Sequence, residues 1–272
     1  MECDPSTSRL RHVRRALFAA IVALVLVGCG GHGKKAAATT TDATRPLPSF
    51  AHAEATTLAL RTAKLDQTTT VVIGGSEVKA YDNGKVAFDG SRAHIYKLDP
   101  GGQFPGEVIV IGPFTYTNAN VQASLQSPGV RPWTKLDTRK VSARAATNQT
   151  DELSHVLAPA YLALGATNVS LKSRVSDGAV FWARVDPKLV IRRVPAARRA
   201  KISKAIRGDY PAAAFNARFW IDGRDRIRRV IVAWTTSSGT PVALDTSYSA
   251  FGSAVDTRLP QADRIKDITP TG

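Results

Sequence analysis

The chain has 272 residues, with 37 lysines and arginines against 22 aspartates and glutamates, and a formal net charge of +15. This length suits one large or two small domains and can enclose a sizeable core. The two cysteines exclude a disulfide-rich scaffold. The basic balance indicates an anionic partner, although a general abundance of arginine would produce the same charge without any function.

The first 29 residues are typical of an export signal. Four arginines precede an uncharged apolar run at 16–27, which is too short to span a bilayer. The run ends in Leu26-Val27-Gly28-Cys29, which resembles the lipobox of bacterial lipoproteins. The resemblance implies that the chain is cleaved before Cys29 and that this cysteine carries fatty acyl groups such as palmitate. The alternative is a secreted protein with an incidental cysteine at this place.

These features predict three regions: a signal peptide at 1–28, a lipidated anchor with a flexible tether at 29–49, and a single folded domain at 50–272. We expect a protein attached to the cell membrane by its lipid and facing the extracytoplasmic side. This location excludes nucleic acid as a partner. No disulfide would form in the processed chain, because Cys3 leaves with the signal and Cys29 is lipidated.

After the tether, composition predicts a helix over 50–66, where good helix formers dominate. Short β-branched runs separated by turn residues then predict strands. They cover residues 69–73, 77–81, 85–88, 93–98, 107–111, 114–117 and 133–136. Asn83-Gly84 lies between two of these runs and predicts a hairpin. Residues 118–132 are polar and predict a long loop.

In the second half of the chain, an apolar stripe at helical spacing predicts a helix over 150–164, kinked or divided at Pro159 and stopped by Gly165. Asp177-Gly178 predicts a hairpin between strands at 169–175 and 179–185. A short basic helix is expected at 195–207, with Ile202 and Ile206 facing inward. Strands are expected at 213–221, 227–234 and 242–248, and the order of elements describes an antiparallel meander.

Two segments carry a family resemblance: WIDGRDRIRRV at 220–230 and YSAFGSAVDTRLP at 248–260. Together with the order of elements, they resemble the actinobacterial LppX/LprAFG-type lipoproteins, whose fold is similar to that of the LolA/LolB lipoprotein carriers. The resemblance implies an α+β fold, a strongly curved antiparallel sheet (an incomplete barrel) covered by a few α-helices. It also implies a space between sheet and helices that holds the acyl chains of lipids or glycolipids.

Residues of the predicted strands are candidates for the wall of that space, since alternate side chains face the concave side of the sheet. The candidates are Val71, Ile73, Ile95, Val108, Val110, Phe215 and Phe219. The same pattern describes an ordinary packed core.

No catalytic chemistry is indicated by the motifs. The four histidines that follow Cys29 lack metal-ligand spacing, and the chain contains no nucleophile elbow, phosphate-binding loop or dinucleotide fingerprint. We therefore expect no enzyme activity, no cofactor and no metal.

A cluster of cations occupies the predicted basic helix. Arg198, Arg199, Lys201 and Lys204 have no acidic residue between them. They are candidates for contact with an anionic lipid surface, and the alternative is a solvated outer face of a covering helix.

The leading hypothesis is a monomeric, membrane-anchored lipoprotein that binds and transfers lipids or glycolipids in an apolar cavity. The alternative is an envelope sensing or interaction lipoprotein with a filled interior, which binds a protein partner or an anionic wall polymer.

Overall fold

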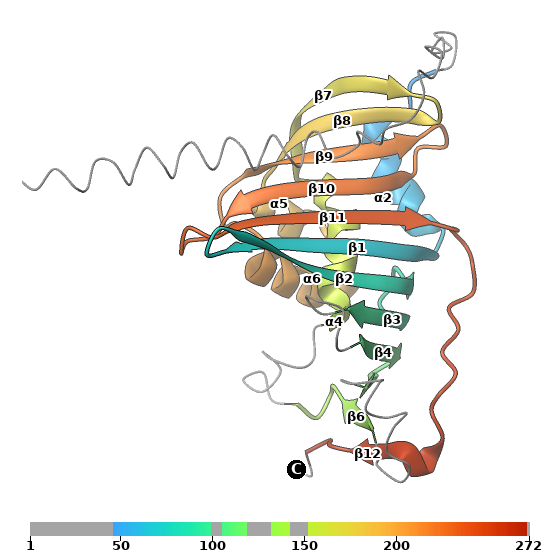
Figure 1. Cartoon of the computed structure of the whole chain (residues 1–272). Helices are drawn as coiled ribbons and strands as arrows, with labels where there is room; N and C mark the ends of the chain where they lie inside the picture. The colour runs from blue at the N-terminus through green and yellow to red at the C-terminus, as the bar shows by residue number, and fades with distance from the viewer. Residues whose placement is uncertain (1–45, 99–104, 119–131, 142–151, 271–272) are drawn as a thin grey trace, which may run out of the picture. The chain divides into compact units, whose positions relative to one another are not determined.

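One antiparallel sheet dominates the fold (Figure 1). The computed structural model describes residues 46–98, 105–118, 132–141 and 152–270. The strands described there form a single 12-stranded sheet in the order β12-β6-β5-β4-β3-β2-β1-β11-β10-β9-β8-β7. They are β1 Thr62–Ile73, β2 Ser76–Ala87, β3 Arg92–Leu98, β4 Pro105–Ile111, β5 Phe114–Asn118, β6 Trp133–Asp137, β7 Ala166–Val175, β8 Gly178–Val185, β9 Phe215–Asp222, β10 Ile227–Thr235, β11 Pro241–Ser249 and β12 Ile265–Asp267.

The sheet consists of two meanders joined in its middle. Strands β1 to β6 follow one another in space, as do β7 to β11, and β1 pairs antiparallel with β11. Strand β12 pairs parallel with β6. The sheet bends around the helices and stays open, with β12 and β7 at its two edges (Figure 1). The expected fold, a curved open sheet covered by a few helices, is confirmed.

The helices cover one face of this sheet (Figure 1). They are α2 Phe50–Ala59, α4 Glu152–Tyr161, the 3₁₀ turn η2 Leu162–Gly165, α5 Pro187–Arg193 and α6 Ala196–Asp209, with a further 3₁₀ turn, η3 Ala262–Arg264, near the C-terminus. Helix α4 packs on α6, and α5 packs on η2. The Asp186 side chain caps α5 by accepting a hydrogen bond from the Lys188 backbone N–H, and Pro187 occupies the first turn, where it displaces no helical hydrogen bond.

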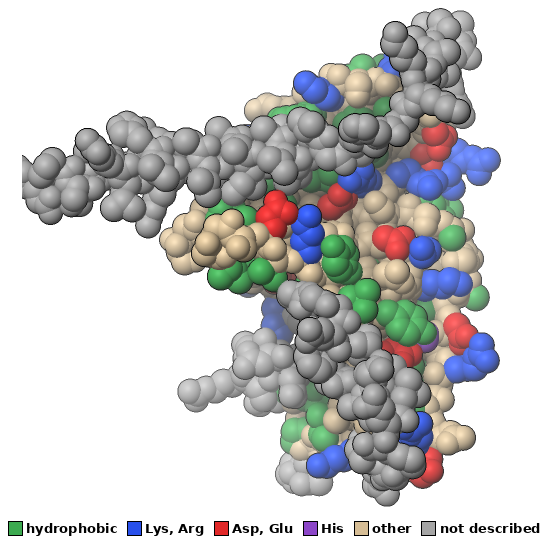
Figure 2. Space-filling view, in the orientation of Figure 1, with side chains coloured by type: hydrophobic (Ala, Val, Ile, Leu, Met, Phe, Trp, Pro, Cys, Tyr) green, Lys and Arg blue, Asp and Glu red, His purple; other side chains and the backbone are tan. Residues whose placement is uncertain are grey.

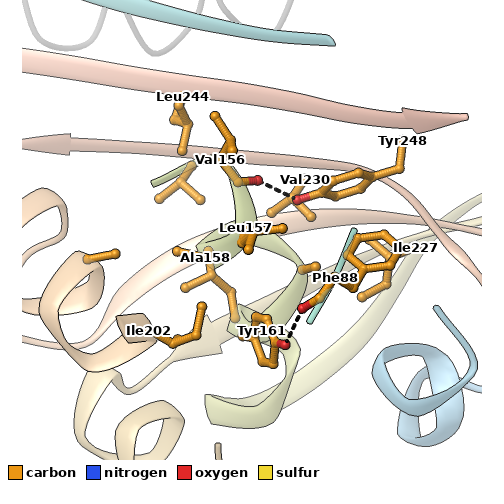
Figure 3. Packing of buried hydrophobic residues seen from close by; sticks show 14 of the residues in the cluster. Phe88, Val156, Leu157, Ala158, Tyr161, Ile202, Ile227, Val230, Leu244 and Tyr248 are labelled. Carbon is orange, nitrogen blue, oxygen red and sulfur yellow. Dashed lines mark hydrogen bonds between the residues drawn. The ribbon is translucent and has the colours of Figure 1, made fainter. Parts of the chain in front are cut away.

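The core lies between the helices and the covered face of the sheet. Its largest fully buried side chains include Tyr161, Tyr248, Phe88 and Phe219. Both tyrosine hydroxyls find partners there: Tyr248 Oη donates to the Val156 carbonyl at 3.1 Å, and Tyr161 Oη donates to the Phe88 carbonyl at 3.0 Å (Figure 3). These hydrogen bonds join α4 to β11 and to the end of β2. The cover is therefore fixed to the sheet by polar contacts as well as by packing.

The first predicted helix is too long. Helix α2 ends at Ala59, Arg61 adopts a positive φ of 63°, and β1 starts at Thr62. Residues 62–66 form ladder pairs with β2 or with β11, and Ala63 and Leu65 face the core at 0 % exposure. These long-range pairs outweigh a helix propensity worth only a few tenths of a kcal/mol per residue.

The hairpin predicted at Asn83-Gly84 is wrong, because β2 runs unbroken through both residues. A Cβ on Gly84 would lie 2.0 Å from the His94 backbone oxygen. The glycine therefore permits a close approach of β2 to β3 and does not form a turn. The turn between β1 and β2 is at Gly74-Gly75, where both residues have positive φ.

The remaining differences are smaller. Helix α4 continues through Pro159 to Tyr161 and then tightens into η2, so the predicted helix is present as an α-helix followed by a 3₁₀ turn. Helix α5 and strand β12 were not predicted from the sequence. The predicted strands that became β3 to β11 and the basic helix that became α6 are confirmed.

Candidate functional site

An apolar row crosses four central strands on the helix-covered face, near the β1–β2 turn. Val78, Val71, Val242 and Trp234 are successive cross-strand partners on β2, β1, β11 and β10. They share a face with buried core residues such as Leu65, because side chains alternate along a strand. Each of the four is half-buried. The row therefore runs from the edge of the core toward solvent.

The inner end of this row is aromatic. Tyr210, which follows α6, stacks on Trp234 with ring centroids 5.6 Å apart and on Phe215 at 5.7 Å. The Tyr210 hydroxyl is buried, and no described group hydrogen-bonds to it. Burial raises the pKa of Tyr210 well above its usual value, so the hydroxyl keeps its proton. The hydroxyl has almost no exposed surface, so a ligand oxygen could accept its hydrogen bond only if neighbouring side chains moved aside.

The seven predicted wall residues fall into two groups. Five of them are buried in one continuous cluster with Val156, Leu157 and Tyr161 of α4: Ile95, Val108, Val110, Phe215 and Phe219. These five contact packed side chains. Val71 belongs to the half-buried row, and Ile73, two residues further along β1, is 61 % exposed.

The wall candidates predicted from the sequence did not include Val78, Val242, Trp234 or Tyr210. Alternation along β10 and β11 assigns Trp234 and Val242 to the core face, and this signal is visible in the sequence. Their position beside Val71 is not, because it depends on the pairing of β1 with β11.

A polar cluster lies under α4, next to the row. His155 of α4 contacts Asp82 of β2, with Nε2 and Oδ2 3.3 Å apart. Thr246 Oγ1 donates to Gln67 Oε1 at 2.9 Å, and both residues are buried. Burial opposes ionisation of Asp82, but the hydrogen bond and charge of His155, with the charge of Lys97, outweigh it and lower the pKa of Asp82. The pair acts as another link between the cover and the sheet.

Basic side chains of α6 serve different purposes. Arg198 Nη1 donates to Tyr161 Oη at 2.8 Å, so this guanidinium is part of the packing around α4. Arg199 and Lys201 are exposed and Lys204 is half-buried. Ile202 and Ile206 are buried beneath them, as the sequence predicted. Arg199 and Lys201 are therefore the members of the predicted basic cluster best placed to meet an external surface.

Cys29, the signal peptide and residues 29–45 of the anchor and tether lie outside the described residues. Within the described part of the chain, no helix has the length and apolar character needed to cross a membrane. The same residues contain no group of three or more His, Cys, Asp or Glu side chains arranged to hold a metal ion.

Known proteins were compared with this chain by sequence and by structure. No family model matches it, and no curated protein matches it. Several solved structures do. The lipoprotein LppX of Mycobacterium tuberculosis is 12 % identical, with a TM-score of 0.41, and the match covers 75 % of this chain and 95 % of that one.

Two other solved structures are more distant. An uncharacterised conserved protein from Thermus thermophilus is 8 % identical, with a TM-score of 0.36, over 78 % of this chain and 95 % of that one. A LolA superfamily protein from Nitrosomonas europaea is 7 % identical, with a TM-score of 0.29, over 73 % and 89 %. LppX and the LolA superfamily belong to the groups that the sequence resembles. All three TM-scores lie below 0.5.

Proposed function

We propose that this chain is a membrane-anchored lipoprotein of the cell envelope that binds the acyl part of a lipid or glycolipid along the apolar row. The row, with the unpartnered Tyr210 hydroxyl at its inner end, is the observation that carries the proposal. An acyl chain would lie across the strands on Val78, Val71, Val242 and Trp234. An ester or carboxyl oxygen would accept the Tyr210 hydrogen bond once neighbouring side chains moved aside to uncover the hydroxyl.

The affinity would come from burying the methylene groups of the acyl chain, and no covalent step is involved. The distance from the first to the fourth strand of the row is about 14 Å, since neighbouring strands are about 4.8 Å apart. Five methylene groups buried along it would contribute about 4 kcal/mol, at about 0.8 kcal/mol each. This is enough for reversible binding, as transfer between a membrane and a partner requires.

A second candidate function is favoured by the packed cluster under α4. With that interior filled, the chain would act as a sensing or interaction lipoprotein that binds a protein partner or an anionic wall polymer. A lipid could enter the space under α4 only if the helix moved and broke the contacts of Tyr248 with Val156 and of His155 with Asp82. The row lies beside this cluster, so binding there leaves α4 in place.

Native mass spectrometry tests the lipid proposal. The full chain with Cys29→Ser is purified from membranes, so that any lipid mass is non-covalent. We expect co-purified lipid, and uptake of added phosphatidylglycerol. Val71→Asp places a charge in the row and should weaken lipid binding at least tenfold in Kd, about 1.4 kcal/mol. Val169→Asp is the matched control, on a strand residue that is 41 % exposed and outside the row.

Two results would reject lipid binding at the row. One is a clean apo mass with no uptake of added lipid, which would favour the function with a filled interior. The other is an equal loss of lipid in Val71→Asp and Val169→Asp, which would show that the row has no special part.

We further propose that Arg199 and Lys201 orient the domain on anionic headgroups. Each cation near such a surface contributes about 1 kcal/mol, so reversing both charges should weaken binding to vesicles rich in phosphatidylglycerol by more than tenfold. Lys172 and Arg184, exposed on β7 and β8, give the matched reversal. Equal binding by the Arg199→Glu/Lys201→Glu variant and the unmodified chain would leave this helix as a solvated cover. Arg198 is kept because it holds Tyr161.

A further inference from the structure

A recess of about 550 Å³ lies on the face of the sheet that the helices do not cover. Its lining includes Asp66, Tyr81, Asn83, Tyr96 and Asp245. These side chains point away from the core, since they alternate along their strands with inward residues such as Leu65. Figure 2 looks onto this outer face, where hydrophobic side chains stand among acidic and basic ones. The recess is therefore separate from the apolar row, which lies on the opposite face.

Strand register gives the recess two unlike halves. Ser247, Asp66, Asn83 and Tyr96 are successive cross-strand partners on β11, β1, β2 and β3. In the neighbouring row, Asp245, Thr68, Tyr81 and Leu98 follow the same four strands. The half over β11 and β1 thus carries carboxylates and hydroxyls. The half over β2 and β3 ends in two aromatic rings and a leucine.

The aromatic half is exposed to an unusual degree. Tyr81 is 42 % exposed, Tyr96 is 48 % exposed and Leu98 is 43 % exposed. Large apolar side chains that gather at one exposed place mark a binding surface more often than isolated ones do. Small-ligand sites usually combine aromatic and apolar side chains with a few well-placed polar groups, and the volume of this recess lies in their usual range of about 300–1,000 Å³.

Tyr96 is held in position before any ligand arrives. Its ring packs on the His94 imidazole with centroids 4.8 Å apart. His94 is fixed in turn, with Nε2 2.6 Å from Glu107 Oε1 and Nδ1 3.0 Å from the Asp256 carbonyl. Burial and the charges of Glu107 and Asp256 raise the pKa of Tyr96, so its hydroxyl stays protonated. A ring whose position is already set loses little freedom when a ligand binds.

The two carboxylates in the polar half are already neutralised. Lys64 Nζ lies 3.2 Å from Asp66 Oδ2, and Arg229 Nε donates to Asp245 Oδ1 at 2.7 Å. Arg229 also lies over the Trp220 ring, 5.0 Å from its centroid, which fixes the pair further. With a cation beside each carboxylate, the recess offers little attraction to a positively charged ligand. The carboxylate oxygens still have lone pairs that accept hydrogen bonds from neutral hydroxyl groups.

We propose that this recess binds a neutral saccharide of one or two sugar units. A sugar ring has a face of C–H groups, which packs on an aromatic ring, and a rim of hydroxyls, which need acceptors and donors. Tyr81 and Tyr96 supply the rings. Asp66 and Asp245 accept hydrogen bonds, and the Asn83 amide both donates and accepts. An acyl chain would cover the Asn83 amide and the remaining carboxylate lone pairs without offering them a hydrogen bond, which disfavours lipid at this site.

This assignment goes beyond lipid binding and does not depend on it. The two sites lie on opposite faces of β1, β2 and β11, so one domain could hold a saccharide on its outer face while a lipid lies on its covered face. A protein that uses both the apolar row and the recess would act where lipids and glycans occur together.

The test is saturation-transfer NMR on the full chain with Cys29→Ser, using cellobiose, maltose and α-1,6-mannobiose as probes. We expect at least one disaccharide to bind with a Kd near 1 mM, about −4 kcal/mol. Tyr96→Ala should weaken binding about tenfold, whereas Tyr96→Phe should stay within about threefold because it keeps the ring. Leu259→Ala, at a residue 49 % exposed outside the recess, is the control for a lost exposed side chain.

Three outcomes would overturn the proposal. One is no saturation transfer to any of the three disaccharides at about ten times the expected Kd. Another is equal binding by Tyr96→Ala and the unmodified chain, with circular dichroism showing both folded. The third is tighter binding of tetramethylammonium than of any disaccharide, which would make the recess an aromatic cation site. Val71→Asp should leave disaccharide binding unchanged, which separates this result from the test of the lipid proposal.

Discussion

The tyrosine hydroxyls of the core give a matched pair of substitutions with opposite expected effects. Tyr210→Phe removes a buried hydroxyl that no described group binds, and it keeps the ring that stacks on Trp234 and Phe215. Tyr248→Phe removes a buried hydroxyl that donates to the Val156 carbonyl at 3.1 Å. The chemical change is the same, so the difference reports the hydrogen bond alone.

The magnitudes follow from these contacts. An unpartnered buried hydroxyl costs about 1–3 kcal/mol, so its removal at Tyr210 should raise the free energy of unfolding by about 1 kcal/mol or more. Loss of the Tyr248 hydrogen bond should lower it by about 1 kcal/mol. For a domain of this size, 1 kcal/mol corresponds to about 2–4 °C in Tm. The two variants should therefore differ by roughly 4–8 °C.

Urea and thermal unfolding of lipid-free protein measure both changes, and native mass spectrometry then measures phosphatidylglycerol uptake. We expect Tyr210→Phe to be more stable than the parent and yet to take up lipid less well, because the donor for the ligand oxygen is gone. A Tm for Tyr210→Phe below that of the parent would refute this reasoning, since the hydroxyl would then have a stabilising partner. Increased stability with unchanged lipid uptake would remove Tyr210 from the site and leave the apolar row alone.

Three further predictions concern the core and the sheet. Phe219→Ala should lower the free energy of unfolding by about 3–5 kcal/mol, because Phe219 is 0 % exposed and packs on Phe50. Ile73→Ala is the exposed control. A loss below about 1 kcal/mol for Phe219→Ala in thermal unfolding would indicate a hollow interior. Gly84→Ala should lower the free energy of unfolding by about 2 kcal/mol or more, since its Cβ would meet the His94 backbone. Gly208→Ala has open space around it and should be neutral or stabilising. Equal Tm values for the two variants would contradict the close approach of β2 to β3. Asp82 has a lowered pKa, so its contribution to stability should be present above the unfolded value of about 3.9 and lost as the pH falls through the folded value. Urea unfolding between about pH 3 and pH 6 should therefore show the advantage of the parent over Asp82→Asn shrinking toward the acid end, and a constant difference would exclude this role.

Most of the strands could be predicted from local pattern. The alternation in β9 correctly assigned Phe215 and Phe219 to the core face, because one residue in two faces the same side of any strand. The glycines at Gly74-Gly75 and Gly178 mark real turns. Asn83-Gly84 has the same appearance in the sequence but lies inside β2. Its glycine is needed because β3 approaches closely, and a Cβ on Gly84 would meet the His94 backbone. A glycine that forms a turn and a glycine that permits a close strand approach look the same in the sequence. Only the packing of the neighbouring strand distinguishes them.

The candidate sites were less accessible to prediction. Five of the seven predicted wall residues are buried in a packed cluster, and Ile73 is largely exposed. Alternation along a strand reports which face a side chain is on, but not what covers that face. Whether a residue such as Ile95 faces a ligand space or another side chain depends on the position of α4, which the strand itself does not encode.

The residue pattern by itself determined an antiparallel meander with several helices, the inward isoleucines of α6, and the expectation of a lipid anchor at Cys29. These properties are local: they follow from the period of apolar residues and from short motifs. The open, helix-covered sheet was expected from the family resemblance. The tertiary structure alone brought together the residues of the two candidate sites, because each is made by register between distant strands. Gln67 and Thr246 are hydrogen-bonded although 179 positions separate them, and the same β1–β11 pairing places Val71 beside Val242 and Asp66 beside Ser247. Such pairs are fixed by the free energy of the whole sheet, and no local stretch of either strand carries that information.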